Sequence, residues 1–179
     1  SGSKDRNPNS IAERLQWLAG GPNENVISYI EFVINGYTFY TKEYDDFSTN
    51  QNSGVTLVAE VMHISGSKDR NPIYKNMSYF GIIEQIYELN YTTFQVPLFH
   101  CKWVDNISGV KVDEMNFAKV NFNVEGEKDE PFIMTSQAMQ VFYVSDPTNK
   151  NWSIILLAIK TNVESDENSI EVDPFIRTS

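Results

Sequence analysis

The chain has few of the residues on which metal, disulfide and nucleic-acid chemistry depend. Its single cysteine, Cys101, excludes an internal disulfide framework, and two histidines are too few to complete the four-ligand array of a structural zinc site. Fourteen basic residues against 24 acidic ones give a net charge of −10, which repels nucleic-acid phosphates at long range. No apolar run approaches the roughly 20 residues of a membrane-spanning helix, and no secretory signal is visible. The sequence therefore predicts no metal, no cofactor and no membrane, in a reducing compartment such as the nucleus or cytoplasm.

Aromatic residues are plentiful, with three Trp, nine Tyr and 11 Phe. Together with a hydrophobic content of 41%, they allow the chain to bury one sizeable core. We assign residues 10–160 to a single β-rich domain and residues 161–179 to a disordered acidic tail. Residues 1–8 recur unchanged at positions 65–72, so we interpret residues 1–9 as a tag-like or duplicated segment.

The longest well-patterned run, residues 79–104, predicts two paired antiparallel strands. The isoleucines in its first half also fit one stripe of a helix, but the tyrosines beside them and the β-rich run that follows favour a strand. In the second half, Phe99, Cys101 and Trp103 share one face. Pro97 lies where the alternation changes phase, which predicts a β-bulge or an edge position and a bent strand like those of barrels.

A β-hairpin is predicted across residues 26–41. Its turn is Asn35-Gly36, the residue pair best suited to the two positive φ angles of a tight primed turn. This turn fixes the register, because each position of one strand then has a defined partner on the other. The apolar face is expected to hold two cross-strand pairs, Ile34 with Tyr37 and Phe32 with Phe39.

The remaining elements follow from local signals. Ser10 and Glu13 form a capping box for a short N-terminal helix, which Gly20 and Gly21 end. Further strands are expected at residues 55–62, 120–124, 141–144 and 152–159, with polar connections at 45–54 and 65–78, extended structure at 110–117 and one helical turn at 135–139. The predicted fold is mainly β: bent antiparallel strands forming a barrel-like domain, with one short N-terminal helix and a disordered acidic C-terminal tail.

Several segments together resemble a known plant domain of unknown function. They include INGYTFYTKEYDDFSTNQNSGVTLVAE, SYFGIIEQIYELNY, VPLFHCKWVD, GVKVDE and EPFIMTSQAMQVFYVSDP, within a likeness that covers residues 11–160. The domain is found beside the transposase of CACTA (En/Spm-type) transposons. In those elements the cutting and joining of DNA is attributed to a separate transposase domain. The resemblance therefore implies a non-catalytic accessory module of a nuclear protein, and it brings no established active-site residues.

A weaker likeness concerns the order of elements. A bent strand pair ending in KWV, then an acidic loop and QVFYV, is similar to the pattern of bromo-adjacent-homology domains. Those domains are β-barrels that read histone tails. The likeness implies a protein or histone-tail partner.

Candidate catalytic and metal-binding residues are few. His100 and Cys101 are strand neighbours that point to opposite faces, and His63 is distant in sequence, so we interpret the three as structural residues rather than zinc ligands or a catalytic pair. The acidic pairs Asp45-Asp46 and Asp113-Glu114 are expected to be solvated charges in turns. The sequence thus predicts no catalytic residue.

Most of the aromatic residues are expected to fill the core, but Tyr and Trp rings can also form a binding surface. Tyr79 opens the first central strand and Trp103 ends the second, so an antiparallel pairing makes their rings neighbours. We expect Tyr143 to complete an aromatic cage for a methylated lysine, with negative charge from Asp105 or Glu114. The alternative is a DNA-contacting accessory domain that helps a transposase engage element ends, through Lys68 and Arg70.

Overall fold

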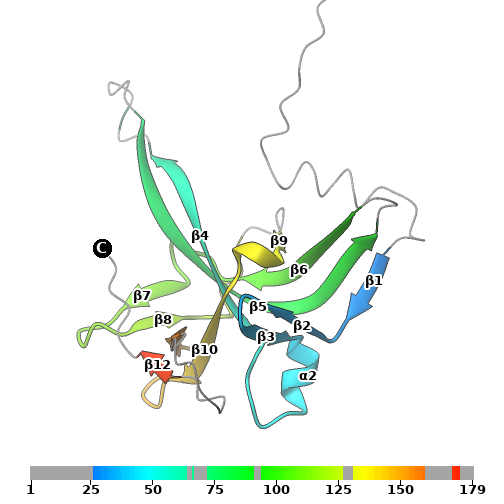
Figure 1. Ribbon diagram of the computed structural model, residues 1–179. Coiled ribbons are helices and arrows are strands. Elements are labelled where there is room, and N and C mark those ends of the chain that lie inside the picture. Colours follow the sequence, from blue (N-terminus) through cyan, green and yellow to red (C-terminus); the bar gives the residue numbers. More distant parts are fainter. Residues whose placement is uncertain are drawn as a thin grey trace, which may run out of the picture.

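The computed structural model describes most of the chain (Figure 1). The described residues are 26–63, 66, 72–90, 94–126, 131–159 and 171–173. They fold mainly into antiparallel β-strands, as predicted. The expected N-terminal helix, the tag-like segment and most of the acidic tail lie outside the described residues. No described helix has the length and apolar character needed to cross a membrane.

The described part contains twelve strands, one α-helix and one 3₁₀ helix. The helices are α2 (Lys42–Asp46) and η2 (Thr135–Gln137). The strands are β1 (Val26–Tyr29), β2 (Glu31–Ile34), β3 (Tyr37–Tyr40), β4 (Gly54–His63), β5 (Ile73–Asn90), β6 (Gln95–Trp103), β7 (Val110–Val112), β8 (Ala118–Val120), β9 (Phe132–Met134), β10 (Met139–Ser145), β11 (Ser153–Ile159) and β12 (Glu171–Asp173).

Ten of these strands form one open sheet. Its order is β7-β8-β11-β10-β4-β5-β6-β9, with β1 added to β5 and β12 added to β11, while β2 and β3 form a separate hairpin. The end strands β7 and β9 are not paired with each other within the described part, so the sheet does not close into the expected barrel. The reason lies in β5, whose 18 residues pair with β4 in the first half and with β6 and β1 in the second. The sheet therefore spreads into two wings that meet near the middle of β5 (Figure 1). The first wing holds β1, β6 and β9, and the second holds β7, β8, β10, β11 and β12.

The expected bulge lies on β5 and not at Pro97. The register between β5 and β6 shifts between Ile83 and Gln85, so Glu84 is the extra residue. Pro97 pairs regularly with Glu88. The predicted change of phase at Pro97 was therefore wrong. The alternative prediction for Pro97, an edge position, is confirmed, because β9 pairs with β6 only from residue 98 onward.

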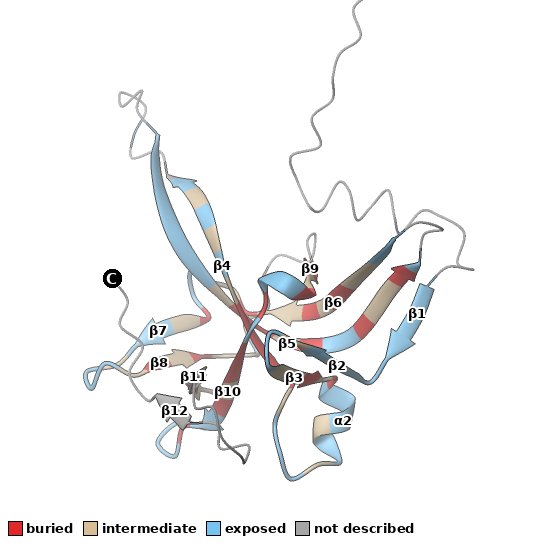
Figure 2. Cartoon of the chain, in the orientation of Figure 1, coloured by how far each residue is buried: buried red, intermediate tan, exposed pale blue. Residues whose placement is uncertain are grey.

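Two hydrophobic clusters fill the sheet where its strands cross (Figure 2). The first surrounds Phe99, whose ring centroid lies 5.0 Å from that of Phe39 on the hairpin. The predicted hairpin register is confirmed, and Asn35 and Gly36 have φ angles of 53° and 78°, as the primed turn requires. The hairpin is shorter than predicted, because β1 pairs with β5 instead of extending it. The second cluster consists of Phe80, Val104, Ala118, Val120, Val141, Tyr143 and Ile155.

Three local predictions were wrong. The connection expected over residues 65–78 is shorter, because β5 already begins at Ile73. The strand expected at residues 120–124 ends at Val120. There the Asn121 side chain accepts a hydrogen bond from the backbone N–H two residues later (3.0 Å), which turns the chain. In the predicted acidic tail, three residues form β12 instead of remaining without structure.

Candidate peptide-binding groove

A groove of about 340 Å³ lies beside the edge of β6. Two backbone hydrogen bonds hold its outer wall to the strand. The Gly126 N–H donates to the Trp103 carbonyl (2.9 Å), and the Cys101 N–H donates to the Pro131 carbonyl (2.8 Å). The lining comprises these four residues together with Glu84, His100, Lys102 and Glu125.

Trp103 supplies the aromatic wall of the groove. Its ring lies over Gly81, the residue that pairs with it across β5 and β6. A Cβ atom at position 81 would lie 2.7 Å from Cε3 of the indole, so only glycine allows this close approach. The ring is half-buried and packs against the first hydrophobic cluster, which leaves part of it for a ligand.

Carboxylates give the groove a negative balance. Glu84 projects from the β5 bulge, and Glu125 forms an ion pair with Lys102 (Nζ to Oε1, 3.0 Å). Oε2 of Glu84 lies 3.4 Å from Nδ1 of His100, without the geometry of a hydrogen bond. The buried Nδ1 atom has no hydrogen-bond partner among the described residues, which is an uncommon state for a buried nitrogen. Because this nitrogen is buried, a ligand reaches it only if the His100 side chain moves.

Cys101 contributes no reactive group to the groove. Burial raises the pKa of its thiol well above the ordinary value, and the charge of Glu84 raises it further. The thiol therefore remains protonated at neutral pH and is a weak nucleophile. No cluster of three or more His, Cys, Asp or Glu side chains that suits a metal ion occurs among the described residues.

The structure brings two of the three predicted cage residues to the same face of the sheet. Tyr79 lies two positions before Gly81 on β5, and Gly81 faces Trp103, so Tyr79 and Trp103 are diagonal neighbours. Tyr143 belongs to the second hydrophobic cluster and is buried. Its hydroxyl donates to the Gly81 carbonyl (2.8 Å), so Tyr143 is a core residue and not a wall of the groove.

The two carboxylates predicted for the cage lie elsewhere. Asp105 caps a turn, since its Oδ2 accepts hydrogen bonds from the backbone N–H (2.8 Å) and the hydroxyl (2.6 Å) of Ser108. These bonds lower the pKa of Asp105. Glu114 is exposed in the turn between β7 and β8 and does not line the groove. Glu84 and Glu125 supply the charge that these two residues were expected to provide.

We expected Asp113 to be a solvated charge, but its carboxylate forms an ion pair. Its Oδ2 lies 2.8 Å from Nζ of Lys119, and the same Nζ lies 2.7 Å from Oδ2 of the buried Asp146. Asp45 is also structural, because its carboxylate accepts the backbone N–H groups of Asn52 and Ser53. These carboxylates hold loops together and are not arranged to bind a metal.

Positive charge in the described part is partly neutralised by carboxylates. Lys68 and Arg70, named for the DNA alternative, lie outside the described residues, as does the side chain of His63. Of the described lysines, Lys75 and Lys150 form no ion pair with another described residue. The others are engaged: Lys42 with Asp46, Lys102 with Glu125, Lys119 with Asp113 and Asp146, and Lys111 over the ring of Trp152 at 3.8 Å.

Sequence reasoning identified Trp103 but missed Glu84, His100 and Glu125 as a group. Each alone is an ordinary charged or polar residue in a strand or turn. Glu84 reaches the groove through a β-bulge, and no local pattern marks that bulge. An isolated β-bridge between Val104 and Glu125 brings Glu125 to the groove. This bridge joins residues that are far apart in the sequence, so no local pattern predicts it.

Among the comparisons with known proteins, a match to a family model covers the central part of the chain. No curated protein and no solved structure matches. The expected likeness to a domain of unknown function is confirmed for the segment from the end of β5 to β11, which carries every lining residue of the groove except Glu84. Residues 87–155 match the model of a family described as Domain of unknown function (DUF4216).

Proposed function

We propose that the chain is a non-catalytic interaction module that binds a cationic segment of a protein partner. The observation that supports this function is the groove beside β6, which Trp103, Glu84 and Glu125 line together. In keeping with the family resemblance, the module belongs to a CACTA-type transposase or to a nuclear protein derived from one. A lysine-containing tail, such as that of a histone, has the matching chemistry.

The contacts expected of such a ligand follow from the lining. A lysine ammonium group above the Trp103 ring gains a cation–π interaction of roughly 0.5 to 2 kcal/mol. Methylation of the ammonium strengthens the contact with the ring, because the methylated cation is less tightly hydrated. Glu84 has a half-exposed carboxylate that attracts the cation, whereas Lys102 already partly neutralises Glu125.

A calorimetric titration tests this function. The protein is titrated with a lysine-rich peptide, unmodified and trimethylated, at low and at physiological salt. We expect tighter binding of the trimethylated form, and Glu84→Gln should weaken binding by roughly fivefold, the effect of one exposed charge pair. Glu114→Gln is the matched control, because Glu114 is an exposed carboxylate outside the groove.

Equal binding by the parent and the Glu84→Gln protein would exclude the groove as the site. The same titration with duplex DNA tests the alternative role in contacting element ends through Lys68 and Arg70. Salt-sensitive DNA binding in the absence of peptide binding would favour that alternative. Magnesium-dependent DNA cleavage by the purified chain would overturn the non-catalytic assignment.

A further inference from the structure

The β4–β5 pair extends beyond the body of the molecule as a two-stranded arm. We define the arm as residues 58–63 and 73–78, which pair from Val58 with Ser78 to His63 with Ile73. Within the described residues, β4 meets β10 only at positions 55 and 56, and β5 meets β6 only from position 81. Both edges of the arm therefore lack a neighbouring strand, and the arm projects away from the rest of the sheet (Figure 1).

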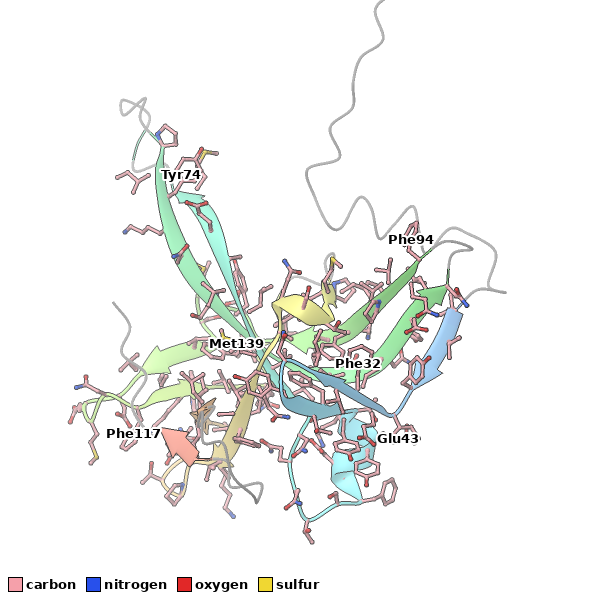
Figure 3. The ribbon with its side chains drawn as sticks, in the orientation of Figure 1. Phe32, Glu43, Tyr74, Phe94, Phe117 and Met139 are labelled. Carbon is pink, nitrogen blue, oxygen red and sulfur yellow. The ribbon has the colours of Figure 1, made fainter. Side chains whose placement is uncertain are left out.

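The arm exposes apolar side chains that a two-stranded ribbon has no means of burying. Five of them are between 40% and 58% exposed: Val58, Met62, Ile73, Tyr74 and Met77. Tyr74 stands near the outer end (Figure 3). An isolated two-stranded ribbon is marginally stable in water, and clustered exposed apolar residues mark contact surfaces. The arm thus requires a covering surface.

The apolar residues occupy both faces of the arm. Met62 and Tyr74 are cross-strand partners on one face, whereas Met77 pairs with Ala59 on the other. A ribbon covered on one side only would alternate apolar and polar residues, with the polar ones facing water. An arm that is apolar on both faces fits between two surfaces. Reciprocal contact with the arm of a second copy covers these residues, since a two-fold axis presents the same surface of each copy to the other.

Charge also favours a second copy as the occupant. The chain carries a net charge of −10, so two copies repel each other except where the contact surface is neutral. The arm strands carry one acidic residue, Glu60, and one lysine, Lys75, and are therefore neutral. A single lysine is too little positive charge for DNA, whose affinity for proteins depends on many phosphate contacts.

The available area suits a weak dimer. Side chains exposed to this degree offer on the order of 100 Å² each, so five from each copy give about 1,000 Å², the lower limit of a specific interface. We propose that two copies of this chain associate through reciprocal contacts between their β4–β5 arms. The association is concentration-dependent, and it leaves the groove beside β6 as a separate site.

Sedimentation velocity over a concentration series up to about 100 µM tests the association. The full chain should shift from monomer to dimer, and the double variant Met62→Ser/Tyr74→Ser should raise the dissociation constant by about tenfold or more. The control is Ile107→Ser, which removes a 93% exposed apolar side chain outside the arm and should leave the dissociation constant unchanged.

A parent chain that remains monomeric at all concentrations would overturn the proposal, as would an arm variant that dimerises like the parent. Far-UV circular dichroism of each variant reports whether it is folded. If the double variant does not fold, Tyr74→Cys replaces it. Under mild oxidation this variant should give a disulfide-linked dimer, and a linked fraction no greater than that of Ile107→Cys would contradict the contact between arms.

Discussion

At the scale of single residues, Lys119 joins two loops through two carboxylates. Its hydrogen bonds to Asp113 and Asp146 raise the pKa of Lys119. The bond from Lys119 lowers the pKa of Asp146 strongly, and the bonds from Thr148 lower it further. The pKa of Asp113 is lowered as well, and the hydrogen bond from Lys119 is the largest cause. The cluster ties β8 to the β7–β8 turn and to the β10–β11 turn.

The signs of these shifts predict how the cluster affects stability with pH. The two carboxyl groups have native pKa values below the unfolded value of about 3.9, so their contribution is present above that pH and is lost on acidification. Asp146→Asn should lower Tm by several degrees at pH 7 and reduce the loss of stability between about pH 5 and pH 2. Thermal unfolding by circular dichroism measures both effects.

Glu114→Gln provides the control for this prediction, because Glu114 lies next to Asp113 but is exposed. Its Tm and its acid profile should follow those of the parent. If Asp146→Asn retained the full acid dependence of the parent, the cluster would not be the source of that dependence.

At the scale of elements, the β2–β3 hairpin depends on its turn. Gly36 has a φ of 78°, a conformation that a β-branched residue adopts only with strain. Gly36→Val should therefore destabilise the protein by about 1 kcal/mol or more. For a chain of this size the expected decrease in Tm is roughly 2–4 °C or more. Asn35→Gly keeps the turn permissive and should change Tm little, whereas a Gly36→Val protein as stable as the parent would contradict this role of the turn.

Elements whose signal is local were predicted well. The pair Asn35-Gly36 fixed the hairpin and its register, and the strands predicted at residues 141–144 and 152–159 correspond to β10 and β11. We predicted a bulge on β6, because the alternation of apolar residues changes phase near Pro97. The structure has the bulge on β5, at Glu84. Closure of the sheet depends on which strands neighbour β5, and that information is not local in the sequence.

The candidate site could be predicted only in part, because local signals mark some of its residues and long-range packing places the others. Trp103 stood out because the end of a central strand and an aromatic residue coincide there. Tyr143 looked equivalent from the sequence, but its strand places it in the core with its hydroxyl bonded to Gly81. Burial of this kind depends on packing between β10 and the β4–β5 pair, which periodicity does not reveal.

At the scale of the whole molecule, β5 connects the two hydrophobic clusters. Phe80 belongs to the second cluster and Ile83 to the first, only three residues apart on one strand. Tyr143 bonds to the β5 backbone from the second cluster, and Gln140 Nε2 donates to the Thr38 carbonyl of the hairpin (2.7 Å). The wings therefore share backbone and side-chain contacts, which couples their stability.

Shared contacts predict one cooperative unfolding transition for the two wings. Trp103 packs on the first cluster and Trp152 lies beside β7 under Lys111, so the two indoles report on different wings. In urea, a protein that retains only Trp103 and one that retains only Trp152 should each show a fluorescence midpoint equal to the far-UV circular dichroism midpoint of the same variant. Comparison within each variant removes the effect of the substitutions on stability. If the Trp152 signal changed at a lower urea concentration than the dichroism, the β7–β8–β11 wing would unfold independently and β5 would not couple the clusters.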